Sequence, residues 1–364
     1  MGCLRLLLAI CVVISHNQPM FGMYMLNGDY AVEIFFMVSG FYMALILNEK
    51  YIGKGSYKSF ITNRFLKIFP TYYACVFATI MISLAFYLSF NNALKLDPFI
   101  HYFNRINSSA QGFMLAVNAI IFGQDVVMFT GVNMKDGAFF VTSNFRESDP
   151  PLYNFLLLPQ AWSISVELMF YLIAPFIARK NIFFIFPFIA ASFGLKYYTT
   201  NVIGLNFDPW TYRFFPSEVG YFLLGVSAYK LLPYARRVNS IKAIPVLVTI
   251  STAYIVIFYH EIDYQYKYIA LCGIFLIAIP IAFDFFKRSK VDRYIGELSY
   301  PVYLIHYIIG MAIGCFSSNS ILLSYKTEIV LLLSIITSVA MMKFIINPID
   351  VIRQKRVLMP QVNN

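Results

Sequence analysis

The feature that most constrains this chain is a series of ten apolar stretches, each close to 20 residues long. A helix needs about 20 predominantly apolar residues to cross the hydrocarbon core of a bilayer. Charged residues make up only 13% of the chain, whereas soluble domains carry about 25%. We therefore predict an all-α, polytopic integral membrane bundle, and we exclude soluble, fibrous and disordered classes. The ten predicted spans lie at about 5–24, 30–48, 68–90, 161–178, 181–199, 214–232, 243–260, 268–286, 298–317 and 326–346.

A further apolar stretch, 112–132, also contains Asn118, Gln124 and Asp125. If it does not cross and the N-terminus is cytosolic, 20 of the 28 Lys and Arg residues lie on the cytosolic side and 8 lie outside. If it crosses, the counts become 12 and 16. Cytosolic loops are rich in Lys and Arg, so we predict ten spans, both termini cytosolic, and a long outer segment near 91–160. Within that segment, 112–132 is expected to form a re-entrant or surface helix.

Two further expectations concern domains and partners. Residues 1–350 form one membrane domain, 351–364 form a short cytosolic tail, and no soluble domain is appended. The net charge of +10 is assigned to the cytosolic loops, so the expected partner is the lipid bilayer and not nucleic acid. The five cysteines are scattered without a C-x-x-C pair, and we predict neither a disulfide framework nor a metal site.

Ionisable side chains within spans are costly and mark functional positions. Arg5 and His16 share the first span, eleven residues apart, which is about 16 Å along a helix. Arg5 is therefore expected near the cytosolic surface and His16 near the middle of the membrane. A histidine at that depth has the chemistry of a general base for a hydroxyl group.

Five other ionisable residues lie in or beside spans. Glu33 is near the outer end of the second, Arg64 and Lys67 open the third from the cytosol, Glu167 is inside the fourth and His306 is inside the ninth. Cations on the cytosolic side suit a phosphorylated donor. Each residue also has a structural alternative: His306 as a hydrogen-bonding residue between helices, and Arg64 and Lys67 as membrane anchors.

Five short motifs follow one another along the chain and carry most of these residues. They include an Arg and a His separated by ten residues, an acidic residue before Phe-Phe and Ser-Gly-Phe, and a Trp-Ser block that precedes Glu167. Together they resemble the motifs of the polytopic membrane acyltransferases called acyltransferase family three, over about residues 4–346. The five motifs are LRLLLAICVVISH, VEIFFMVSGFYMALIL, NRFLKIFPTYY, WSISVELMFYLIAP and IGELSYPVYLIH.

This resemblance implies O-acylation, usually O-acetylation, of a sugar hydroxyl with cytosolic acetyl-CoA as the donor. The implied acceptors are surface or lipid-linked glycans, and the implied location is a bacterial inner membrane. Family members often carry an extracytoplasmic domain, so here the membrane domain alone or a separate partner delivers the acceptor. The family's second motif Arg is Lys67 here, which keeps the charge but loses bidentate phosphate recognition.

The resemblance also suggests roles for individual residues. His16 deprotonates the acceptor hydroxyl or relays the acyl group, and Ser299, Tyr303 and His306 polarise the thioester carbonyl. Glu33 or Glu167 orients His16 or binds the acceptor, with a purely structural role as the alternative for Glu167. Both direct transfer and a covalent acyl intermediate are consistent with these roles. The predicted catalytic residues are His16, Glu33, Glu167, Ser299 and His306, and the predicted donor-binding residues are Arg5, Arg64, Lys67 and Tyr303.

Two competing functions fit the same composition. One is a glycan or lipid transporter or flippase without acyl-transfer activity, although no internal repeat of the kind common in transporters is evident. The other is a membrane transferase that acylates lipid. The sequence lacks H-E-x-x-H, G-x-S-x-G and Walker motifs, which disfavours a metalloprotease, a serine hydrolase and an ATP-driven pump.

Overall fold

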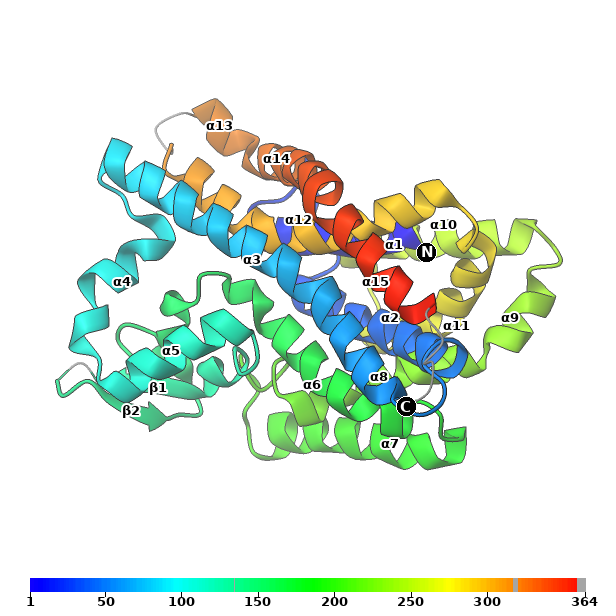
Figure 1. The fold of residues 1–364 in the computed structure, drawn as a ribbon. Helices are drawn as coiled ribbons and strands as arrows, with labels where there is room; N and C mark the ends of the chain where they lie inside the picture. The colour runs from blue at the N-terminus through cyan, green and yellow to red at the C-terminus, as the bar shows by residue number, and fades with distance from the viewer. Residues whose placement is uncertain (134, 317–319, 359–364) are drawn as a thin grey trace.

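The computed structural model is a bundle of helices with one small hairpin, and it describes residues 1–133, 135–316 and 320–358 (Figure 1). The prediction of a helical membrane protein is confirmed. The exception is a two-stranded antiparallel sheet in which Thr130 pairs with Val141 and Asn133 with Ala138. The strands are β1 (Thr130–Asn133) and β2 (Ala138–Val141).

Within the described residues, each predicted span overlaps one long helix, and five shorter helices lie between or after them. The long helices are α1 (Gly2–Ser15), α2 (Gly28–Glu49), α3 (Ser56–Phe90), α6 (Trp162–Ile177), α7 (Ile182–Tyr197), α8 (Phe215–Lys230), α10 (Ala243–Ile257), α11 (Lys267–Phe286), α12 (Lys290–Gly314) and α14 (Lys326–Met341). The shorter helices are α4 (Asp97–His101), α5 (Ser108–Ile120), α9 (Leu232–Val238), α13 (Ser320–Ser324) and α15 (Asn347–Leu358).

The expected number of ten spans is only partly supported. Among the described residues, six helices are long and apolar enough to cross a membrane, and the pair α9–α10, bent by 114°, would make a seventh. Two of the others are short: α1 has 14 residues and α8 has 16. α12 carries four charged residues, Lys290, Asp292, Arg293 and Glu297, in its first eight positions.

The first predicted span is shorter than expected. α1 ends at Ser15, and the chain then runs through an irregular loop to Gly28. Pro19 lacks the amide hydrogen that a continuing helix needs, and Gly22 has a φ of 78°, a conformation that favours glycine. As a result, His16 lies at the very end of α1.

The outer segment 91–160 is a folded unit, and its apolar stretch 112–132 is not one helix. α5 is 13 residues long, about 20 Å, and the chain continues from it through a 3-10 turn at Val126–Phe129 into β1. The side chain of Asn107 caps α5 by accepting from the Ala110 amide at 2.8 Å. The segment has its own small apolar core, made by Ile106, Met114, Val127, Phe145, Phe155 and their neighbours.

This segment packs deep against the bundle, beside α3 (Figure 1). The Tyr72 hydroxyl on α3 donates to the Asn118 carbonyl at 2.7 Å. The Tyr303 hydroxyl on α12 donates to the Gln160 carbonyl at 2.7 Å, and the Gln160 amide donates to the Leu304 carbonyl at 2.5 Å. The segment therefore reaches the part of α12 that carries Tyr303 and His306.

Glycines on both helices allow α2 and α8 to approach each other closely. A Cβ atom at Gly40 of α2 would lie 1.9 Å from the Phe222 carbonyl of α8, and one at Gly225 would lie 1.9 Å from the Met37 carbonyl. Around this crossing, Phe222 stacks on Phe36 and Phe170 at ring-centroid distances of 4.5 and 4.3 Å. Close packing of this kind replaces hydrophobic driving force when helices associate in lipid.

α1 and α12 run side by side in the same direction. A Cβ atom at Gly2 would lie 1.7 Å from the Asp292 carbonyl, and the Asp292 carboxylate accepts from the amino group of Met1 at 2.9 Å. We call this end of the bundle the Met1 end and the opposite end, where α3 finishes, the Phe90 end. Because both helices start together at the Met1 end, His16 comes to lie next to His306.

The last helices are continuous. α15 follows α14 through a π-helical turn at Met342–Ile346. Residues 351–358 of the predicted cytosolic tail therefore belong to a helix, and the rest of that tail, 359–364, lies outside the described residues.

Candidate active site

The site is built around two histidines that contact each other. His306 Nε2 lies 3.1 Å from His16 Nδ1, and the ring centroids are 5.1 Å apart. His306 is fully buried and its Nδ1 is 3.3 Å from the Val302 carbonyl. The His16 side chain is exposed, and its Nδ1 also lies 3.1 Å from the Val12 carbonyl oxygen.

These contacts assign the histidine tautomers. A carbonyl only accepts, so His306 Nδ1 donates to Val302 and its Nε2 carries a lone pair. That lone pair accepts from His16 Nδ1, whose other neighbour is also an acceptor. The assignment follows from the hydrogen-bond network, and it leaves His16 Nε2 with a lone pair, which is the form a general base needs.

His16 separates two cavities. The larger, about 420 Å³, lies between the loop before α2, the start of α6 and the loop before α8. Its walls include aromatic rings from Tyr24, Trp162, Tyr212, His260 and Tyr303, and polar side chains from Ser15, Asn27, Asp29 and Arg213. The smaller, about 150 Å³, is lined by His16, Asn17, His306, Tyr307, Gly310, Met311 and Lys326.

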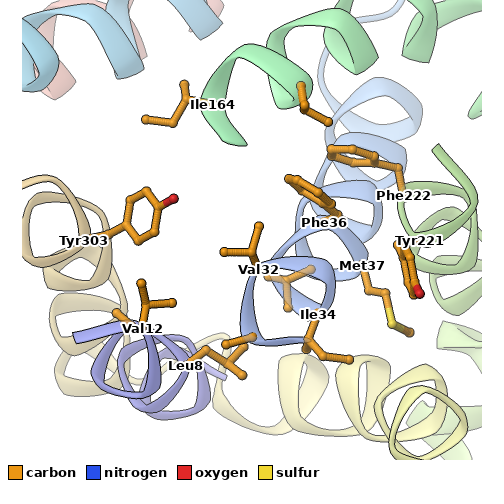
Figure 2. Close-up of a cluster of buried hydrophobic side chains, with 14 of the residues drawn as sticks. Leu8, Val12, Val32, Ile34, Phe36, Met37, Ile164, Tyr221, Phe222 and Tyr303 are labelled. Atoms are coloured by element: carbon orange, nitrogen blue, oxygen red, sulfur yellow. The ribbon is translucent and has the colours of Figure 1, made fainter. Parts of the chain in front are cut away.

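The inner wall of the larger cavity is apolar. Val12, Val32 and Tyr303 line it from α1, α2 and α12, and they belong to the cluster of buried side chains drawn in Figure 2. The Tyr303 hydroxyl is held by Gln160 and by Ser163, each at 2.7 Å. The cavity thus combines a rigid apolar floor with a polar and aromatic rim, the arrangement found in sites for small organic ligands.

Arg213 is the cation of the larger cavity. Its Nε and Nη2 donate to the two Asp208 carboxylate oxygens at 2.5 and 3.0 Å, and Nη2 also donates to the Tyr212 hydroxyl at 2.8 Å. The guanidinium lies over the Trp162 ring at 4.4 Å from its centroid. Its side chain is 13% exposed, and its charge lies within electrostatic range of His16.

The predicted donor-binding cations gather at the Met1 end. The Lys67 ammonium lies within electrostatic range of Arg5, Arg64, Arg353 and Glu297. The Arg5 guanidinium lies 5.9 Å from the Tyr42 ring centroid. Arg64 Nε is buried without a hydrogen-bond partner among the described residues. Three of the four predicted donor-binding residues therefore share one place, whereas the fourth, Tyr303, lines the cavity that contains His16.

Arg353 joins this cationic group from α15, and sequence reasoning missed it. It pairs with Asp350 at 2.9 Å one helical turn away. In the sequence it was one of several basic residues in the presumed tail, with nothing to set it apart. Only the return of α15 toward α3 brings it to Lys67.

Neither predicted carboxylate contacts His16 in the described structure. One Glu33 oxygen accepts from Lys196 and the other accepts from the Tyr268 hydroxyl. Glu167 accepts from the Ser39 and Tyr171 hydroxyls. The neighbours of His16 Nδ1 are instead His306 and the Val12 carbonyl, and binding of the acceptor by one of the two carboxylates stays a prediction.

The two remaining predicted residues differ in their surroundings. His306 contacts His16 directly, whereas the buried Ser299 hydroxyl donates to the Gly296 carbonyl of its own helix at 2.7 Å. Ser299 therefore makes a local helix bond. Sequence reasoning also missed Arg213 and Asp29, which carry no motif of their own and reach the cavity from loops and helix starts.

Lys95 is a buried lysine in the outer segment. Its ammonium donates to the Asn154 carbonyl at 3.0 Å and lies 5.9 Å from the Tyr307 ring centroid. Burial lowers the pKa of Lys95 to about 7. No group of three or more His, Cys, Asp or Glu side chains able to hold a metal ion occurs within residues 1–133, 135–316 and 320–358.

The comparison with known families agrees with this geometry. A family model described as an acyltransferase domain matches residues 1–343. The chain belongs to acyltransferase family three. No curated protein and no solved structure gives a significant match. Membership confirms the resemblance drawn from the five motifs, and it makes this chain a membrane acyltransferase.

Proposed function

We propose that this acyltransferase moves an acetyl group from cytosolic acetyl-CoA to a hydroxyl of a surface or lipid-linked glycan. The observation that carries the proposal is the position of His16. Its Nε2 carries a lone pair at a cavity with an aromatic and polar rim, while Arg5, Arg64 and Lys67 gather toward the Met1 end. A hydroxyl acceptor and a phosphate-bearing donor would thus approach from opposite ends.

The donor fits the cationic group by charge. CoA carries several phosphate charges, and guanidinium and ammonium groups bind phosphates by charge-assisted hydrogen bonds. Arg5 and His16 are eleven residues apart on or next to α1, about 16 Å along the axis. The extended pantetheine arm of CoA would bridge this distance and bring the thioester to His16.

The acceptor fits the cavity by shape and polarity. Aromatic rings offer flat apolar faces, and the Asn27, Asp29 and Arg213 side chains offer donors and acceptors. Sugars present the same combination of apolar faces and hydroxyl edges. An aliphatic acceptor would leave these polar groups unpaired, which costs binding energy.

The chemical step uses His16 as a general base. His16 Nε2 takes the hydroxyl proton as the oxygen attacks the thioester carbonyl carbon. The carbon–sulfur bond then breaks, and the thiolate takes the proton from His16. His306 holds His16 in the tautomer that performs both transfers, so direct transfer needs no further base.

The proposed topology has ten spans with both termini in the cytosol of a bacterium, in its inner membrane. In this arrangement Arg5, Arg64 and Lys67 face the cytosol, as positive charges generally do. The larger cavity then faces outward, and a separate partner could deliver the glycan to it.

Two cysteines test this topology. Cys3 lies exposed at the Met1 end and Cys315 lies exposed near the Phe90 end. A membrane-impermeant maleimide added outside intact cells should label Cys315 and leave Cys3 unlabelled until the membrane is opened. The reverse pattern would overturn the orientation.

The activity is tested with membranes that contain the wild type or His16→Ala, supplied with acetyl-CoA labelled in its acetyl group. We expect label in the glycan fraction from the wild type and none from the variant. His101→Ala is the matched control, because its side chain is 59% exposed in the outer segment. Label in lipid alone would indicate a lipid acyltransferase, and glycan export without acetyl-CoA would indicate a transporter.

A further inference from the structure

The Arg213 guanidinium has two hydrogen-bond donors left over. A guanidinium carries five N–H groups. The Asp208 carboxylate accepts hydrogen bonds from Nε and from one N–H of Nη2, and the Tyr212 hydroxyl accepts a hydrogen bond from the other N–H of Nη2. Across residues 1–133, 135–316 and 320–358, no partner is recorded for the two N–H groups of Nη1.

The protein fixes this guanidinium firmly in place. The bidentate pair with Asp208 sets the plane of the group. The Trp162 and Tyr212 rings lie on it, at 4.4 and 4.7 Å from the guanidinium carbon to the ring centroids. Arg213 therefore loses little conformational entropy when Nη1 binds a ligand, which is the property of a preorganised donor.

Arg213 and His16 line the same cavity, and among the residues that the structure describes no other arginine or lysine does so. Acyl transfer from a thioester to a hydroxyl develops negative charge on the carbonyl oxygen beside the base. Stabilisation of this charge by fixed donors is usually the largest single contribution to such catalysis. Among the hydroxyl groups that line the cavity, those of Ser15, Tyr212 and Tyr303 already donate within the protein, to the Cys11 carbonyl, the Asp208 carboxylate and the Gln160 carbonyl.

We propose that Arg213 is a catalytic residue whose Nη1 donates two hydrogen bonds to the oxyanion formed when the acceptor hydroxyl attacks the acyl-CoA carbonyl. The inference rests on the proposed acyl transfer. As the new carbon–oxygen bond forms, the carbonyl π electrons move onto the oxygen that Nη1 contacts, and the hydroxyl proton moves to His16. When the carbon–sulfur bond breaks, the carbonyl re-forms, sulfur takes the proton from His16, and Nη1 is released.

An alternative role is recognition of an anionic group on the acceptor. The charges around the cavity argue against it. Asp208 already neutralises Arg213, and Asp29 adds a carboxylate to the same cavity. A site built for an anionic acceptor would leave its cation unpaired and exclude a second carboxylate.

The test compares Arg213→Met with Arg146→Met. Arg146 is also near Asp208, at 3.8 Å, but its side chain is 61% exposed and does not line the cavity. We expect Arg213→Met to lower kcat about 10²- to 10³-fold with KM for acceptor and acetyl-CoA nearly unchanged. Arg146→Met should retain the wild-type kcat, because exposed ion pairs contribute little.

Chemical rescue separates catalysis from a structural role. Added methylguanidinium should restore part of the kcat of Arg213→Ala and should not help His16→Ala. Arg213→Lys should fall between wild type and Arg213→Met, since a lysine keeps the charge and loses the fork to Asp208. If the Arg213 variants fail to fold, Asp208→Asn provides the second test: it keeps the guanidinium but loosens it, and kcat should fall with an unchanged KM.

The outcomes distinguish this inference from the proposed function. If the wild type transfers acetyl groups and Arg213→Met does so with equal kcat, or with a raised acceptor KM alone, the role of Arg213 in the transition state is overturned. Absence of rescue by methylguanidinium in a folded Arg213→Ala protein would also overturn it. Absence of transfer by the wild type would overturn the proposed function, and this inference with it.

Discussion

Two polar regions of this bundle use their charges in opposite ways. One, the Lys196 cluster, joins four helices through Lys196 on α7, Glu33 on α2, Glu218 and Tyr221 on α8, and Tyr268 on α11. The other is the larger cavity, where His16, Arg213 and Asp29 meet.

In the Lys196 cluster all the polar groups but one form hydrogen bonds within the protein. An ammonium has three donors, and Lys196 gives them to Glu33, Glu218 and the Tyr221 hydroxyl. Both oxygens of Glu33 accept hydrogen bonds, and Glu218 Oε2 lacks a partner in the described part of the chain. Charged side chains that are already hydrogen-bonded to one another have few free donors or acceptors with which to bind a substrate.

In the larger cavity, polar side chains keep hydrogen-bonding groups that a ligand can use. His16 Nε2 has a lone pair, Arg213 Nη1 has two N–H groups, and Asp29 forms no ion pair among the described residues. Unpaired polar groups at a cavity are costly unless a ligand completes them. Glu33 and Asp29 lie one turn apart on α2 and so share a face of that helix, and the difference between the regions depends on which side chains of other helices each carboxylate meets.

The largest expected effect is in the cavity. His16→Ala should reduce acetyl transfer by about 10²- to 10⁴-fold, the usual contribution of a general base, with the thermal unfolding temperature little changed. Initial rates and unfolding curves of the purified protein in detergent measure both. A large loss of stability with the loss of activity would place His16 with the structural residues instead.

Next in size is the loss of the ammonium from the Lys196 cluster. Lys196→Met leaves Glu33 and Glu218 buried without their cation, and removal of one partner of a buried ion pair costs about 3–5 kcal/mol. Thermal unfolding and expression level are the measurements. Lys287→Met is the control, because it removes a pair with Asp284 in which the lysine side chain is 36% exposed. Equal unfolding temperatures of Lys196→Met and Lys287→Met would contradict the structural role of the Lys196 cluster.

The matched pair Asp29→Asn and Glu33→Gln sharpens the comparison within one helix. A hydrogen bond to a charged group contributes about 1.5–3 kcal/mol, so each substitution should lose about that amount, but in different measurements. Asp29→Asn should raise KM for the acceptor at unchanged stability, and Glu33→Gln should lower stability at unchanged KM. An exchange of these two results would show that Glu33 belongs to the active site after all.

The last expected effect is a pH dependence of the stability. Lys95 is buried, whereas Lys196 is half-buried, and the Lys95 ammonium bonds to a carbonyl and not to carboxylates. Burial lowers its pKa to about 7 in the folded protein, below its value of about 10.4 in an unfolded chain. The unfolded chain therefore binds more protons between these values, and stability should rise with pH from about 7 to about 10.

Lys95→Met should remove that rise. Unfolding temperatures measured across this pH range in wild type and Lys95→Met test it, with the exposed Lys135 mutated to Met as control. A rise of the same size in Lys95→Met would assign the pH dependence to other groups.

The sequence alone determined the class of the protein and much of its site. Stretches of about 20 apolar residues with few charges have one stable outcome in lipid, a bundle of helices. The spacing of Arg5 and His16 on one helix, and the five motifs in order, gave the family that the match over residues 1–343 confirms. Local patterns carry such information because a helix repeats at a fixed interval along the chain.

Only the tertiary structure decided which polar groups meet. Glu33 and His306 were equal candidates in the sequence, yet α1 and α12 bring His306 to His16, while α7 and α8 bring Lys196 and Glu218 toward Glu33. Arg213 and Arg353 had no local pattern at all. Helix packing in lipid depends on close fits such as Gly2 against Asp292, and these contacts between distant segments set the partners of each buried charge.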